Sequence, residues 1–153
     1  MGGGGIGPSE AIAPSLAVLV GFDPGRDKCG VAVTMLTGEV IEHQVVAAAA
    51  ALDWVRSLQG RFAVAGLVLG DRTSSKLWQA QLREGLDPAP PILLVDEHRT
   101  SLLARDRYWQ MYPARGLTRL LPQGLREPPR AIDDIVAILL VERYLAAAQP
   151  LPG

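Results

Sequence analysis

Two apolar runs separated by a short turn constrain the fold of this chain more than any other feature. Residues 16 to 22 are apolar, the sequence Asp23-Pro24-Gly25 follows, and a second apolar run covers residues 29 to 36. Asp-Pro-Gly favours a turn, because proline fixes one backbone dihedral and glycine tolerates another. A carboxylate is costly to bury, so Asp23 either caps the turn or holds a cation. This segment alone leaves both interpretations open.

The rest of the chain alternates between strand and helix patterns. Residues 39 to 46 partly alternate apolar and polar side chains, which is typical of a strand with one exposed face. Three strands joined by tight turns form an antiparallel meander. The further predicted elements are, in order, a helix over 47–58, a strand over 64–69, a helix over 74–84, a strand over 92–95 and helices over 100–110 and 131–148. This order, βββαβαβαα, predicts an α/β domain with a five-stranded mixed sheet and helices on both faces.

Length and composition fit one cytoplasmic domain. A chain of 153 residues can bury a core without disulfides, and its single cysteine, Cys29, lies inside an apolar run as a small buried hydrophobe. Residues 1–15 lack the charged and apolar regions of a signal peptide. We therefore expect flexible tails at 1–15 and 149–153 around a domain of residues 16–148. No apolar run has the length needed to span a bilayer, so no membrane contact is expected.

Positive charge is concentrated in residues 99 to 130. This segment carries seven arginines against two acids, whereas the parts of the chain before and after it have net charges of −4 and −2. The planar fork of arginine suits phosphate, and the aromatic side chains of Tyr108, Trp109 and Tyr112 lie among the arginines. The segment is the candidate nucleic-acid surface, although a solvated helix face explains its charges about as well. The candidate phosphate-binding residues are Arg26, Lys28, Arg99, Arg105, Arg107, Arg115, Arg119, Arg126 and Arg130.

Acidic residues follow three of the predicted strands and open the last helix. They are Asp23, Asp71, Asp96, Glu97, Asp133 and Asp134. Each acid alone is explained by a turn or a helix cap, but the carboxyl ends of parallel strands meet at one edge of a sheet, where ligands bind. Carboxylates gathered there repel one another unless a cation lies among them, as in two-metal phosphoryl transfer with Mg²⁺ or Mn²⁺. The two histidines, His43 and His98, are too few for a zinc site, and His43 is expected to be structural.

Three motifs recur along the chain in the order in which they occur in a known family. Residues 20–25 with 30–33 resemble "G-x-D-x-G … G-V-A-V", residues 95–101 resemble "D-E-R-x-T-T", and residues 132–140 with 144–145 resemble "V-D-x-x-A-A-x-x-I-L … Y-L". The chain thereby resembles the YqgF family of RNase H-like proteins, which is regarded both as Holliday-junction resolvases and as pre-16S rRNA processing nucleases. Two positions depart from the family pattern. Residues 69–76 replace a "G-L-P-x-x-x-x-G" loop, and His98 replaces the arginine of "D-E-R".

The resemblance implies an RNase H-like fold with strand order 3-2-1-4-5. It also implies that Asp23, Glu97 and Asp133 are the catalytic, metal-binding acids, with Asp71 and Asp134 as further candidate ligands of Mg²⁺ or Mn²⁺. The implied partners are structured RNA or branched DNA, including ribosomal precursor particles. The sequence fits both a monomer and a homodimer.

The leading hypothesis is a metal-dependent nuclease that hydrolyses phosphodiester bonds in structured nucleic acid. A second hypothesis is a non-catalytic RNA- or ribosome-binding module that retains the fold. A third hypothesis takes the turn at Asp23 as the phosphate loop of an actin-like or sugar-kinase fold, and it ranks last because the chain is too short for two such domains.

Overall fold

The computed structural model describes residues 16–72 and 75–148 of the chain. In chain order the elements are β1 (Ala17–Asp23), β2 (Lys28–Met35), β3 (Val40–Ala47), α2 (Ala48–Gln59), β4 (Ala63–Gly70), α3 (Ser75–Gly85), β5 (Ile92–Val95), α4 (Thr100–Met111), the 3₁₀ turns η2 (Gly116–Leu120) and η3 (Gln123–Leu125), and α5 (Asp133–Ala148). The predicted order of strands and helices is confirmed. The expected tails at 1–15 and 149–153 lie outside the described residues.

The five strands form one mixed sheet in the order β3-β2-β1-β4-β5, which confirms the implied order 3-2-1-4-5. Strand β1 is central, antiparallel to β2 and parallel to β4, and β4 is parallel to β5. The carboxyl ends of β1, β4 and β5 therefore lie at the same edge of the sheet. This edge is the place where the sequence predicted that the acids converge.

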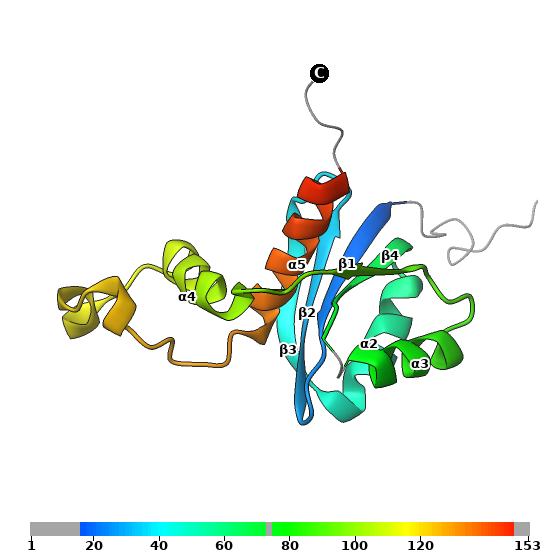
Figure 1. Ribbon diagram of the computed structural model, residues 1–153, viewed down its shortest axis with the longest axis horizontal. Coiled ribbons are helices and arrows are strands. Elements are labelled where there is room, and N and C mark those ends of the chain that lie inside the picture. The colour runs from blue at the N-terminus through cyan, green and yellow to red at the C-terminus, as the bar shows by residue number, and fades with distance from the viewer. Residues whose placement is uncertain (1–15, 73–74, 149–153) are drawn as a thin grey trace, which may run out of the picture.

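Helices cover both faces of the sheet because the buried side chains of β1 alternate between them. Val18, Val20 and Phe22 pack with α2 and α3, whereas Leu19 packs with α4 and α5 on the opposite face. Figure 1 shows α2 and α3 on one side of the sheet and α5 on the other. By the same alternation Asp23 lies on the face that α5 covers.

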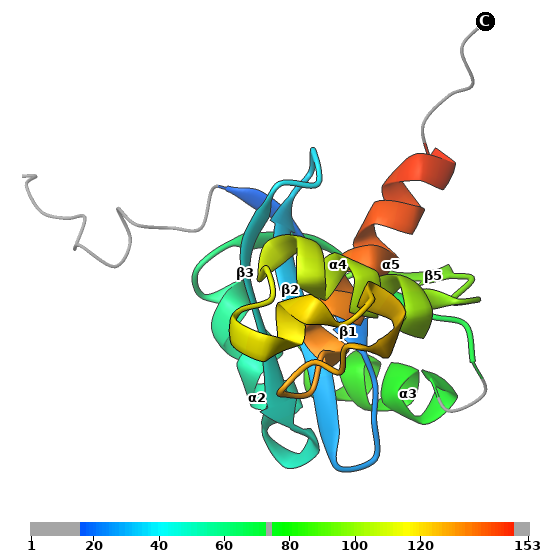
Figure 2. The ribbon, with the colours of Figure 1, turned by 90° about the vertical axis from the view of Figure 1, so that its left-hand side faces the viewer.

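Helix α4 lies outside α5, and the chain between them extends away from the sheet. We call this segment, residues 112–130, the arm, and it contains η2 and η3. Figures 1 and 2 show that the arm and α4 lie on the α5 side of the sheet, with the arm projecting beyond α4. None of the helices within residues 16–72 and 75–148 has both the length and the apolar character needed to cross a membrane.

Candidate active site at the carboxyl edge of the sheet

Asp23 and Asp133 are brought together by a close contact between α5 and the sheet. Asp23 is the last residue of β1, and its register partner on β2 is Gly30. A side chain at Gly30 would overlap the backbone carbonyl of Asp133, and one at Gly21 would overlap the carbonyl of Ala137. The first turns of α5 thus lie directly on the glycines of β1 and β2, and Asp133 starts beside Asp23.

Glu97 reaches the same place from the loop after β5. Its carboxylate occupies the space that a side chain at Gly70 would need. Gly70 ends β4, one residue beyond Leu69, which pairs with Phe22 on β1. Glu97 therefore lies over the end of the strand next to Asp23, and only 8% of its surface is exposed.

The loop that carries Glu97 is fixed by hydrogen bonds to α4 and α5. Thr100 Oγ1 donates to the Glu97 carbonyl at 2.8 Å. From α5, Arg143 donates to the carbonyls of Asp96, at 2.7 Å, and of His98. The backbone of His98 donates to the Asp96 carboxylate at 2.9 Å, which gives Asp96 a structural role in the loop. Helix α5 therefore both carries Asp133 and braces the loop of Glu97.

The charges at this edge are unbalanced. Burial, reinforced by the negative charges of Asp133 and Glu97, raises the pKa of Asp23 to about 7, although Arg72 acts in the opposite direction. Burial also raises the pKa of Glu97, in spite of an ion pair with Arg72. Asp71 is exposed, and its charge contributes to the raised pKa of Glu97. A cation at this edge would reverse these shifts.

The carboxylates of Asp23, Glu97 and Asp133 have the right chemistry for a hard divalent cation, but their oxygens do not converge on one point. Carboxylate oxygens are the ligands that Mg²⁺ and Mn²⁺ prefer. However, no three His, Cys, Asp or Glu side chains within residues 16–72 and 75–148 are close enough together to hold one ion. Glu97 is turned to Arg72. Arg72 was missed by the sequence analysis, and no periodicity could have shown that a residue 25 positions earlier pairs with Glu97.

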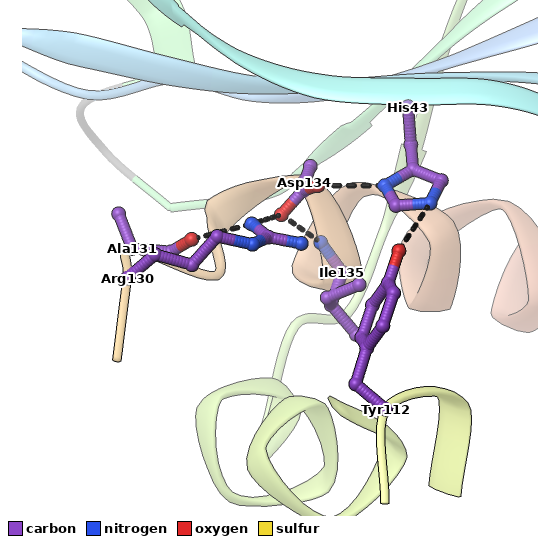
Figure 3. Close-up of polar contacts among 6 residues, drawn as sticks. All are labelled: His43, Tyr112, Arg130, Ala131, Asp134 and Ile135. Carbon is purple, nitrogen blue, oxygen red and sulfur yellow. Dashed lines mark hydrogen bonds and ion pairs between the residues drawn. The ribbon is translucent and has the colours of Figure 1, made fainter. Parts of the chain in front are cut away.

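Asp134, the neighbour of Asp133, has a different environment. Its carboxylate is 1% exposed and accepts hydrogen bonds from the backbone of Ile135 at 3.0 Å and from Arg130 at 3.0 Å, and it contacts His43 Nδ1 at 2.6 Å (Figure 3). Burial acts to raise the pKa of Asp134, but the bonds from Arg130 and His43 outweigh it and the pKa is lowered. The oxygens of Asp134 are thus already used, and the predicted structural role of His43 is confirmed.

The same network fixes both ends of the arm. Tyr112, its first residue, places its hydroxyl 3.5 Å from His43 Nε2, and Arg130, its last residue, binds Asp134 (Figure 3). The guanidinium of Arg130 also lies over the ring of Tyr112, at 5.8 Å from the centroid. The network therefore ties the arm to β3 and to the start of α5. No periodic pattern in the sequence could have revealed this network, because its members are up to 91 residues apart.

The nine predicted phosphate-binding residues fall into two groups. Four guanidinium groups are engaged within the protein: Arg107 binds Glu142 through two bonds of 2.9 and 2.8 Å, Arg105 binds the carbonyl of Arg126, Arg126 binds the carbonyls of Leu121 and Arg119, and Arg130 binds Asp134. The other five are exposed, and their side chains make no hydrogen bond to any residue in the described part of the chain. They are Arg26, Lys28, Arg99, Arg115 and Arg119.

Comparison with known proteins gives a match at the level of structure. No family model matches the sequence, and no curated protein sequence matches it. The fold is similar to that of RuvC from T. thermophilus in complex with a Holliday junction substrate, with 17% sequence identity over 86% of this chain and 95% of that chain and a TM-score of 0.50. A second structure of Thermus thermophilus RuvC has 16% identity over 84% and 94% of the two chains and a TM-score of 0.49. The fold is RNase H-like, as the sequence motifs implied.

Proposed function

We propose that this chain is a metal-dependent nuclease that hydrolyses phosphodiester bonds in structured nucleic acid. The observation that supports it most is the gathering of Asp23, Glu97 and Asp133 at one edge of the sheet, where burial and like charge raise the pKa of Asp23 to about 7. Such an arrangement is unfavourable for the free protein and favourable for one that holds a cation. The likeness of the fold to RuvC in complex with a Holliday junction substrate is consistent with this proposal.

In this proposal Asp23, Glu97 and Asp133 hold Mg²⁺ or Mn²⁺. Asp71 lies close enough to Glu97 for its negative charge to raise the pKa of Glu97. The cation, when bound, supplies Lewis acidity and offsets the charge of the scissile phosphate. Asp134 has no ligand role here, because it is committed to His43 and Arg130. Arg72 holds the Glu97 carboxylate in the free protein and releases it to the cation. The exposed basic residues, among them Arg26, lie free to contact backbone phosphates.

The motifs shared with the YqgF family support two substrate classes, a precursor of 16S rRNA and a four-way DNA junction. The decisive experiment incubates the purified wild-type protein with each substrate, in Mg²⁺ and in EDTA, beside Asp23→Asn. Asp27→Asn is the matched control, because Asp27 is exposed in the turn that follows β1. Cleavage that needs Mg²⁺, survives Asp27→Asn and is lost in Asp23→Asn supports the proposal. Cleavage that survives both EDTA and Asp23→Asn contradicts it.

A non-catalytic RNA-binding module is the second candidate function. The arrangement of Glu97 favours it, since this side chain is paired with Arg72 and the carboxylates in the described residues do not close around one ion. The same experiment separates the two functions when binding is measured alongside cleavage. A module binds RNA without Mg²⁺-dependent turnover, and Asp23→Asn leaves its affinity unchanged.

A further inference from the structure

A pocket separate from the carboxylate edge lies between the end of α4 and the arm. Its volume is ≈ 430 Å³, which is within the range of sites that bind small molecules. Among its lining residues are Tyr108, Trp109, Tyr112, Arg115, Thr118 and Glu127. None of the carboxylates proposed to hold the cation lines it.

The lining combines three aromatic side chains with polar groups of both signs. Aromatic rings stack on nucleobases of any sequence. The exposed Arg115 is suited to a phosphate, whereas the exposed Glu127 can accept a hydrogen bond from the amino group of a base. Tyr108 and Trp109 are 7% and 9% exposed, whereas Tyr112 is 42% exposed and offers the most accessible ring of the three.

We propose that this pocket binds an unstacked nucleobase of a single-stranded part of the substrate. The inference rests on the proposed function in that the ligand is nucleic acid. A base within a duplex is stacked on both faces, so only a loop, a bulge or a strand end can present one to a pocket. A further exposed cation beside the pocket supports the proposal. Arg119 lies in the same 3₁₀ turn as Thr118 and can contact the phosphate next to the bound base.

The test uses a short single-stranded RNA backbone that is abasic except for one 2-aminopurine, here called the complete strand, and the same backbone made abasic at that position too. The wild-type protein is expected to quench the 2-aminopurine and to bind the complete strand at least about fivefold more tightly than the abasic one, given the usual strength of stacking between a base and an aromatic side chain. Binding is measured by fluorescence anisotropy in EDTA, so that no cleavage occurs.

Thr118→Trp fills the pocket and is expected to abolish both the quenching and the preference for the complete strand. Leu117→Trp is the matched control, because the adjacent Leu117 is 83% exposed and does not line the pocket. Tyr112→Leu removes an aromatic wall while keeping its bulk, and it serves as the second variant if Thr118→Trp does not fold. Thermal unfolding of each variant checks that the fold is kept.

The inference is overturned if wild type binds both strands equally, or if folded Thr118→Trp or Tyr112→Leu keeps the preference. It is also overturned if wild type is a dimer that Thr118→Trp dissociates, because the pocket would then hold a second copy of the chain. Failure of the nuclease proposal gives a different result. In that case base-dependent binding remains, and Mg²⁺-dependent cleavage of either substrate is absent.

Discussion

The backbone carbonyl of Asp133 lies against the α-carbon of Gly30, with no room for a side chain between them. Gly30 is the register partner of Asp23, so this contact sets the separation of two of the three proposed metal ligands. It also decides how closely α5 lies on the sheet. The glycine is therefore needed for the site as well as for the core.

Gly30→Ala is expected to push α5 away from the sheet. The new methyl group would meet backbone atoms, which cannot rotate aside, so we expect a loss of about 1–3 kcal/mol or more in the free energy of unfolding, measured in urea. Nuclease activity should fall by more than the fraction of protein that is unfolded, because the separation of Asp23 and Asp133 also changes. Gly124→Ala is the control, because a side chain there meets nothing within 4 Å. Equal stability of the two variants would show that α5 is not held by this contact.

Asp23→Asn is expected to stabilise the protein at pH 8 in EDTA. The pKa of Asp23 is about 7 in the folded protein and lower in the unfolded chain, so above pH 7 the folded state carries an unfavourable buried charge that asparagine removes. As the pH falls from 7 towards 4, the folded carboxyl group binds a proton before the unfolded one does, and wild type regains this stability. The difference is at most about 3 kcal/mol at pH 8 after allowance for solvent screening.

Thermal unfolding of wild type and Asp23→Asn from pH 5 to pH 8 measures this difference. Addition of Mg²⁺ at pH 8 should narrow it, because the cation stabilises only the wild-type carboxylate. Asp27→Asn should follow wild type at every pH. A difference that grows as the pH falls would have the wrong sign for a raised pKa.

Arg72→Gln is expected to raise the affinity for Mn²⁺. Arg72 pairs with Glu97 in the free protein, so its removal releases the carboxylate that the cation needs. Calorimetric titration with Mn²⁺ compares this variant with Arg83→Gln, a change at an exposed arginine of α3. Weaker binding of Mn²⁺ by Arg72→Gln would mean that Arg72 supports the site rather than competing for it.

His43→Gln is expected to lower the free energy of unfolding by about 1–3 kcal/mol, because the buried Asp134 loses a hydrogen-bond partner. His98→Gln, at an exposed loop position, should change it by less than about 0.5 kcal/mol. Since the network also holds Tyr112, limited proteolysis should cleave the arm faster in His43→Gln than in wild type. Equal rates of cleavage would indicate that the arm is held by other contacts.

Arg119→Gln and Arg107→Gln are expected to act on different properties. Arg119 is exposed in the arm, so its loss should weaken binding of nucleic acid and reduce the dependence of log affinity on log salt by about one phosphate contact. Arg107 is bound to Glu142, so its loss should lower stability and leave the salt dependence unchanged. Binding titrations at several salt concentrations measure both slopes, and a reduced slope for Arg107→Gln would mean that Arg107 also contacts phosphate.

The sequence by itself determined the strands, the helices and the acids that follow the strands. These features depend on local patterns: apolar runs mark the buried strands, and turn residues mark where β1 ends at Asp23. Asp96 and Glu97 follow the last strand in the same way, and it is the resemblance of residues 95–101 to a family motif that implied Glu97 as the ligand. The resemblance of three motifs to those of the YqgF family implied the strand order, and the observed sheet has this order.

Only the tertiary structure decided which charged groups are free. Asp133 and Asp134 are adjacent in the sequence and both open α5, yet Asp133 begins beside Asp23 while Asp134 is buried against His43 and Arg130. Ion pairs form between groups that the fold brings together, whatever their separation along the chain, so no local pattern records them. For the same reason the arginines of residues 99–130 look alike in the sequence, and only their partners in space distinguish a structural guanidinium group from one that can bind phosphate.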